Sequence, residues 1–396
     1  MKDGWKLATV GDVCTYRPQR NGCADLKAES EVTFLPMEDL KAGAPHTEPR
    51  QTRPLQAVAK GYTYFQDGDL LLAKITPCFQ NGKLAIAQGL TNGVGFGSTE
   101  YIVLRPGGEV SPKYVYYFLS RQEFRDGGVA RMGGAVGQQR VPVEYVLTQH
   151  LPLPPLPEQQ RIVAILDEAF AAIEQARANT EKNLQNAREL FESYLNQMLT
   201  EKAEGWVEKR LGDVCTISSS LIDPRAPEQQ HLRHVGAGNM EAETGALHSL
   251  MTAQQEGLIS AKFAFDETAV LYSKIRPYLK KVARPSFAGL CSADVYPLVP
   301  GEKVTRDFLF YLLLTTDFTE YAIRGSARAG MPKVNRPHLF DYRAWLPAVA
   351  TQQIICERLD QVSTESQGLQ ACYRRKLAAL DNLRKSLLHQ AFNGEM

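Results

Sequence analysis

The chain has 396 residues, of which 44% are hydrophobic and 22% are charged, so it has the composition of a folded protein with room for two or three domains. No run of 18 apolar residues is present and residues 1–5 lack the apolar segment of a signal peptide, so we expect a cytoplasmic protein. The seven cysteines include no C-x-x-C pair, and no cysteine neighbours His231 and His234. Free thiols are therefore expected, and no metal site.

The net charge of +1 is unusual for a protein that binds nucleic acid, but it is unevenly distributed. Residues 1–156 carry +2, residues 157–204 carry −4, residues 205–345 carry +2 and residues 346–396 carry +1. Because the acidic excess lies in one segment, the basic residues elsewhere could gather on a surface. Ordinary solvated charge explains the composition equally well.

An internal repeat runs through the whole sequence. Gly11-Asp12-Val13-Cys14-Thr15 returns as Gly212-Asp213-Val214-Cys215-Thr216, and Lys74-Ile75-Thr76-Pro77 returns as Lys274-Ile275-Arg276-Pro277. The offset falls from 201 at Gly11 to 193 at Gln159 and then stays constant. The sequence therefore predicts a duplicated unit with a variable first part and a second part of fixed length.

The first part of each repeat has the pattern of a mixed domain. In residues 1–152, short apolar runs at 70–75, 84–87 and 101–104 predict strands, Asn81-Gly82 predicts a hairpin, and residues 113–120 predict a short helix. In residues 204–345, the runs at 270–275 and 295–299 predict strands and residues 308–314 predict a helix. The fold class expected is α+β, with two such domains related by the repeat.

Residues 153–203 and 346–396 have the pattern of long helices. Pro157 should open the first helix, Thr351 should cap the second, and Gly368 is a glycine within the second helix. Apolar residues recur at steps of mostly three and four. The residues predicted to pair the helices are Ile162, Leu166, Ile173 and Leu184 in the first, and Ile355, Leu359, Leu369, Leu380 and Leu387 in the second.

The two helices are expected to pair as an antiparallel coiled coil, because each is the only equally long partner of the other. Two alternatives remain open at this point. Each helix could pack on its own globular domain, or on a second chain.

The segment that opens the first helix carries a family resemblance. Its sequence is Leu153-Pro154-Pro155-Leu156-Pro157-Glu158-Gln159-Gln160-Arg161-Ile162-Val163, which resembles the specificity subunit of type I restriction–modification systems. The resemblance implies four parts: target-recognition domain 1 (1–152), a central conserved helix (153–203), target-recognition domain 2 (204–345) and a C-terminal conserved helix (346–396). The second copy, Thr351-Gln352-Gln353, lacks the Pro-Glu pair, so the start of its helix is less well defined.

The resemblance also implies a function. Each domain would read one half of a bipartite, asymmetric target in double-stranded DNA, while the helices space the domains and dock two methyltransferase subunits. Two motor–nuclease subunits could join them. The chain itself would be non-catalytic, and S-adenosylmethionine, ATP and Mg would be used by the partner subunits.

Candidate DNA-contact residues follow from chemistry, because phosphates are bound by cations and base edges by Arg, Lys, Asn or Gln. They are placed at equivalent positions of the repeat. In the first domain they are Lys74, Thr76, Gln80, Asn81, Lys83, Gln138, Gln139 and Arg140; in the second they are Lys274, Arg276, Tyr278, Lys280, Lys281, Arg328, Lys333 and Asn335. Any one of them could instead be a solvated surface residue.

Rival functions fit the sequence less well. A fused methyltransferase would need an Asn/Asp-Pro-Pro-aromatic motif, and a nucleotide-driven motor would need G-x-x-x-x-G-K-[ST]; the sequence has neither. A coiled-coil scaffold that binds only proteins would explain the helices. It would explain the paired Lys-Ile-x-Pro segments poorly.

Overall fold

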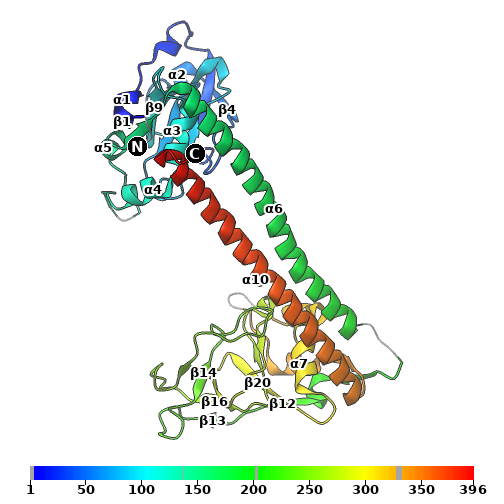
Figure 1. Ribbon diagram of the computed structural model, residues 1–396. Coiled ribbons are helices and arrows are strands. Elements are labelled where there is room, and N and C mark those ends of the chain that lie inside the picture. Colours follow the sequence, from blue (N-terminus) through cyan, green and yellow to red (C-terminus); the bar gives the residue numbers. More distant parts are fainter. Residues whose placement is uncertain (1–3, 136, 201–203, 327–331) are drawn as a thin grey trace. The chain divides into compact units, whose positions relative to one another are not determined.

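The computed structural model describes residues 4–135, 137–200, 204–326 and 332–396 (Figure 1). The chain divides into two compact units, which we call unit 1 (Met1–Thr180 with Arg375–Met396) and unit 2 (Glu181–Arg374). Each unit therefore combines a globular head with a part of both long helices, whereas the predicted division set the helices apart from the heads.

The head of unit 1 is built on three small sheets. Two of them have four strands, in the orders β2-β9-β6-β7 and β4-β3-β8-β5, and the third pairs β1 with β10. All neighbours are antiparallel except β3 and β8, which are parallel. The strands are β1 (Lys6–Thr9), β2 (Cys14–Tyr16), β3 (Glu31–Leu35), β4 (Gln51–Pro54), β5 (Thr63–Gln66), β6 (Leu70–Ala73), β7 (Leu84–Ile86), β8 (Val94–Gly97), β9 (Tyr101–Pro106) and β10 (His150–Leu153).

Short helices cover this head, and the most apolar of them is α3. Six consecutive residues of α3 are buried, so it lies inside the hydrophobic core. The helices of the head are α1 (Val10–Val13), α2 (Leu55–Val58), α3 (Pro112–Leu119), α4 (Gln122–Val129) and α5 (Val143–Leu147), with 3₁₀ turns at Asn21–Cys23 and Thr91–Gly93.

The head of unit 2 repeats this plan. It has a sheet of order β12-β20-β17-β18, a second of order β13-β16-β19-β14-β15 and the pair β11-β21, and β14 and β19 are again the parallel neighbours. The strands are β11 (Val207–Arg210), β12 (Cys215–Ile217), β13 (Leu221–Ile222), β14 (Arg233–Val235), β15 (Met251–Thr252), β16 (Lys262–Phe265), β17 (Val270–Ser273), β18 (Val282–Ala283), β19 (Gly289–Cys291), β20 (Val295–Pro300) and β21 (Arg343–Leu346). The helices are α7 (Arg306–Leu312), α8 (Thr316–Arg324) and α9 (Arg336–Asp341), with 3₁₀ turns at Leu211–Asp213 and Pro277–Leu279.

The α+β class, the repeat and the two long helices are confirmed. The runs predicted as strands at 70–75, 84–87 and 101–104 fall on β6, β7 and β9, and residues 113–120 fall on α3. The hairpin predicted at Asn81-Gly82 is wrong in its length. Strands β6 and β7 do pair antiparallel, but the whole segment 74–83 connects them, because β6 ends at Ala73.

The long helices α6 (Leu156–Thr200) and α10 (Val349–Asn393) each have 45 residues. A fully buried glutamine fixes the start of each. The side-chain amide of Gln159 donates to the carbonyls of Glu109 and Pro154 and accepts from the Ser111 amide, and Gln352 makes the same three bonds to Lys303, Pro347 and Thr305.

The predicted cap at Thr351 is wrong. Helix α10 has already begun at Val349, so Thr351 lies inside its first turn and not at its cap position. Its counterpart α6 begins at Leu156, so Pro157 lies in the first turn, where the missing amide proton costs nothing.

The two helices run antiparallel within each unit. In unit 1, Arg384 donates to Glu174 at 2.9 Å and Arg177 to Asp381 at 2.8 Å, so partner numbers fall along one helix as they rise along the other. In unit 2, the Ser366 hydroxyl donates to the carbonyl of Ala187 at 2.8 Å. The predicted antiparallel pairing of the helices is confirmed.

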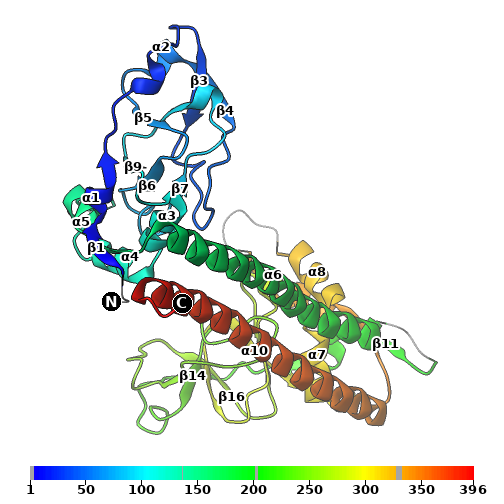
Figure 2. The same ribbon diagram turned by 45° about the horizontal axis from the view of Figure 1, so that its top comes forward.

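Both helices also enter the cores of the heads. Figures 1 and 2 show the end of α10 beside the beginning of α6 in unit 1, where Leu388, Ala391 and Phe392 join the core built by the head. The Phe392 ring lies 5.0 Å from that of Tyr114, centroid to centroid. In unit 2 the end of α6 supplies Leu195 and Leu199 to the core in the same way. Helix pairing and packing on a head thus occur together.

The residues predicted to pair the helices have different environments. Leu369 is an error: its side chain is 47% exposed, and the buried position of that turn belongs to Ser366. Leu184 is half-buried. The others lie in or against a core: Ile162, Leu166, Ile173, Leu380 and Leu387 in unit 1, and Ile355 and Leu359 in unit 2.

Phe392→Ala should lower the free energy of unfolding by about 3–5 kcal/mol, because it leaves a cavity among Tyr114, Phe118 and the helices. Leu383→Ala, on the same helix but 47% exposed, should cost about 0.5 kcal/mol or less. Urea unfolding of both variants measures the difference. Equal losses would contradict the packing described for the end of α10.

Candidate nucleic-acid interface

In each unit, three segments far apart in sequence meet where a central strand ends. The amide of Lys74, directly after β6, donates to the carbonyl of Glu100 at 2.9 Å, and the carbonyl of Lys74 accepts from the Val141 amide at 2.9 Å. Lys274, directly after β17, makes the matching bonds, from its amide to Asp294 at 2.9 Å and from the Val334 amide at 2.8 Å. Isolated bridges between residues 75 and 140 and between 275 and 333 tie the same segments together.

A carboxylate stands between two cations at this junction in unit 1. Arg140 donates to both oxygens of Glu100, at 2.9 and 2.8 Å, and the Lys74 amine lies 3.9 Å from the same group while it donates to the carbonyl of Thr99. The hydrogen bonds from Arg140 hold the pKa of Glu100 below its ordinary value.

Unit 2 has the same arrangement with looser geometry. The amines of Lys333 and Lys274 lie 3.4 and 3.9 Å from Asp294. Lys274 also lies 5.2 Å from the centre of the Tyr296 ring, and the guanidinium of Arg336 lies 5.7 Å from it. We call these two groups the cation clusters; each has two cations on one carboxylate, and therefore a surplus positive charge.

Polar side chains lie on the loops that carry the clusters. In unit 1, Thr76 ties the 74–83 segment to residue 139, since its hydroxyl accepts from the Gln139 amide at 3.1 Å. Gln80, Asn81 and Gln138 are exposed on these loops. The peptide bond between Thr76 and Pro77 is cis.

The corresponding loop of unit 2 contains Arg276, whose backbone lies in the left-handed region with a φ of 50°. Arg276 is exposed, and the side chain of Tyr278 is 53% exposed. The two loops thus leave matching strand ends but differ in backbone conformation and in the side chains that they present.

Several predicted contact residues have structural partners instead. The amines of Lys83 and Lys281 donate to the carbonyls of Met37 and Ala237, both at 2.7 Å, and Lys280 pairs with Glu192. Asn335 caps α9 by accepting from the His338 amide. Arg328 lies outside the described residues.

Three residues at the clusters were not predicted. An acidic residue has no obvious place among DNA-contact candidates, so Glu100 and Asp294 were given no role. Arg336, which faces Tyr296, was missed because its counterpart in the first repeat, Val143, is apolar.

Within the ranges the structure describes, no helix is long and apolar enough to cross a membrane. The same residues contain no group of three His, Cys, Asp or Glu side chains that could hold a metal ion.

The duplicated head-and-helix fold, with one cation cluster on each head, defines a two-headed repeat protein. A family model described as the type I restriction modification DNA specificity domain matches residues 2–182 and again 203–371. The chain belongs to this family.

Curated relatives match about half of the chain. The chain is 33% identical over 212 residues to the type I restriction enzyme EcoAI specificity subunit of Escherichia coli, which is 52% of this chain and 36% of that protein. It is 32% identical over 206 residues to the EcoDI specificity subunit of the same organism, covering 52% of this chain and 46% of that protein. The chain therefore spans less than half the length of these relatives.

Two solved structures share the fold over the full chain. One, from work on complex assembly and conformational transition of the type I R-M system, has a TM-score of 0.81 at 18% identity and covers 100% of this chain and 99% of the other. The other is the HsdS subunit from Thermoanaerobacter tengcongensis, with a TM-score of 0.63 at 20% identity, covering 100% and 98%.

Glu100→Gln should destabilise unit 1 by about 1 kcal/mol at most at pH 7, because the ion pairs are partly exposed. Because the pKa of Glu100 is lower in the folded chain than its ordinary value of about 4.3, its ion pairs stabilise the fold fully above that value. This stabilisation is lost as the pH falls through the lowered pKa of the folded state. The difference between wild type and variant in urea unfolding should therefore shrink from pH 7 to pH 3. A difference that is the same at both pH values would show that the ion pairs do not stabilise the fold.

Proposed function

We propose that this chain is the sequence-specific DNA-recognition subunit of a type I restriction–modification complex. The observation that carries the proposal is that a cation cluster recurs at the same strand end of both heads, within a chain of the specificity family. Each head would read one half of a bipartite target.

The chemistry of the loops supports this division of labour. Lys74, Arg140, Lys274 and Lys333 can bind backbone phosphates, which fixes a protein on the duplex without reading it. The exposed amides of Gln80, Asn81 and Gln138 and the exposed Arg276 and Tyr278 can reach base edges, where sequence is read. Because these side chains differ between the heads, the two half-sites should differ, and the target should be asymmetric.

The helices have a separate role in the proposal. A continuous helix between two reading heads would set the spacing of the half-sites, as a dimer interface does in repressors with two chains. The helices would also dock two methyltransferase subunits, to which two motor–nuclease subunits could be added. S-adenosylmethionine, ATP and Mg would belong to those partners, so this chain would contribute recognition and no chemistry.

The alternative function is a coiled-coil scaffold that binds proteins only. Selection from a random duplex library, with the methyltransferase partner present, separates the two. Recognition predicts an enriched motif in two parts with an unread gap. Replacing residues 1–152 by the corresponding domain of a relative should then change one part and leave the other intact. Binding that falls with salt but enriches no sequence would contradict the proposal.

Lys74→Ala and Lys274→Ala should each weaken binding to the selected duplex about tenfold and reduce the salt dependence of binding by about one phosphate contact. Lys376→Ala, an exposed cation of α10, is the matched control and should leave both unchanged. Fluorescence anisotropy at several salt concentrations gives both quantities. Normal affinity in both cluster variants, with unchanged melting, would remove the cation clusters from the interface.

A further inference from the structure

Two cavities occupy corresponding places in the two units. One, in unit 1, has a volume of about 370 Å³, and the other, in unit 2, about 320 Å³. One face of a long helix forms part of the lining of each, and the four residues on that face are related by the repeat offset of 193. They are Asp381, Arg384, Lys385 and Leu388 of α10 in unit 1, and Arg188, Phe191, Glu192 and Leu195 of α6 in unit 2. In unit 2, residues 363–374 of α10 line the cavity as well.

The cavity of unit 2 contains its own anion. The carboxylate of Glu192 accepts from the Lys280 amine and from the Thr316 hydroxyl, the latter at 3.2 Å. The hydrogen bond from Lys280 holds the pKa of Glu192 below its ordinary value. The chain thus neutralises the Lys280 cation of this cavity internally.

The loop residue that matches Lys280 is Gly82. The amide of Ala73 donates to the carbonyl of Lys83, and the amide of Ser273 donates to the carbonyl of Lys281, so Lys83 and Lys281 are equivalent. The residues that precede them, Gly82 and Lys280, are therefore equivalent too, and both have a positive φ, 72° and 46°. The space beside Gly82 is taken by Arg125, since a β-carbon at residue 82 would lie 2.4 Å from its Nη1 atom. A guanidinium therefore stands near the point where the Lys280 side chain leaves the backbone in unit 2.

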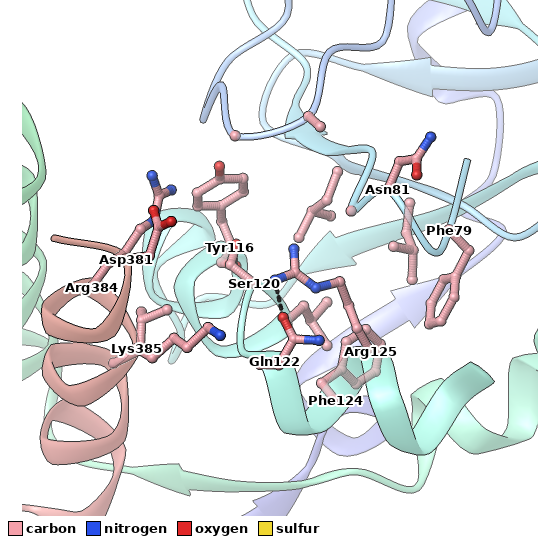
Figure 3. Close-up of a pocket in the computed structure, with 17 residues that line it drawn as sticks. Phe79, Asn81, Tyr116, Ser120, Gln122, Phe124, Arg125, Asp381, Arg384 and Lys385 are labelled. Carbon is pink, nitrogen blue, oxygen red and sulfur yellow. Dashed lines mark hydrogen bonds between the residues drawn. The ribbon is translucent and has the colours of Figure 1, made fainter. Parts of the chain in front are cut away.

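The helix residue that matches Glu192 is Lys385, so the anion of unit 2 is replaced by a second cation. Arg125 donates to the neutral side chain of Gln122 at 2.8 Å, and Figure 3 shows Lys385 reaching from α10 toward the same residue. The one carboxylate among the lining residues, that of Asp381, accepts from Arg177. Among the described residues, no carboxylate pairs with Arg125 or Lys385.

We propose that the cavity of unit 1 binds a phosphate group from outside, at the place where unit 2 holds the Glu192 carboxylate. A dianion would balance the two cations, and the planar donors of a guanidinium match phosphate oxygens. The volume admits a molecule of mononucleotide size. Asn81, a candidate DNA-contact residue, also lines the cavity. The phosphate can therefore come from a free phosphorylated molecule or from a nucleic-acid backbone. The inference does not depend on the proposed reading of DNA.

Lys385→Glu tests the inference, because it gives unit 1 the internal carboxylate that unit 2 already has. Calorimetric titration of the full chain with inorganic phosphate, and then with a mononucleotide, is done at constant ionic strength. The variant should bind each about tenfold or more weakly than wild type. Lys376→Glu makes the same change of charge at an exposed position of α10 outside the cavity and should bind like wild type.

A third titration, with a short duplex of random sequence, distinguishes the two sources of phosphate. Loss of the free phosphate and mononucleotide signals in Lys385→Glu alone identifies a small phosphorylated ligand. Loss confined to duplex affinity, again in Lys385→Glu alone, identifies a backbone phosphate. Equal binding of all three probes by wild type, Lys385→Glu and Lys376→Glu, or no phosphate binding by wild type in any titration, would overturn the proposal.

Discussion

The hydrophobic core of each unit is closed by the end of a helix that begins in the other unit. Phe392 and Leu388 of α10 pack with α3 and the start of α6 in unit 1, and Leu195 and Leu199 of α6 pack in the core of unit 2. Burial of apolar surface is the dominant favourable contribution to folding, so neither repeat can bury its full core alone. This exchange of helix ends explains why the helical part of the repeat has a fixed length. A one-residue insertion there would rotate the last apolar residues away from the head that they complete.

The constant framework leaves the loops of the heads free to vary. The backbone bonds that hold Lys74 and Lys274 are the same in both units, and so is the carboxylate between two cations. The segment after each strand nevertheless differs in length and in side chains. The proposed reading of two different half-sites would use this combination, because the phosphate contacts could stay while the base contacts change.

More of the fold than of the interface could be predicted from the sequence. The repeat, the long helices and the main strands follow from periodicities that burial imposes, and the matched pair Gln159 and Gln352 was visible as a repeat before its bonds were known. The prediction that Leu369 pairs the helices is wrong, because heptad spacing does not reveal that Ser366 bonds across to Ala187 and takes the buried position. Among the candidate contact residues, Lys83, Lys280 and Lys281 look like DNA ligands in a sequence, yet they bind carbonyls or a carboxylate that only the folded chain brings near. The exchange of helix ends was not predicted, since periodicity shows that a face is apolar and not which surface covers it.

Hydrogen–deuterium exchange of a chain that ends at residue 374, compared with the full chain, tests directly whether the end of α10 completes the core of unit 1. The deletion removes only residues of the second repeat, but those residues belong to unit 1. The account predicts that amides of α3 in the first repeat lose protection, while amides of β17 and β20 in unit 2 keep theirs. Unchanged protection of α3, with losses confined to the remaining part of α10 or to unit 2, would contradict it.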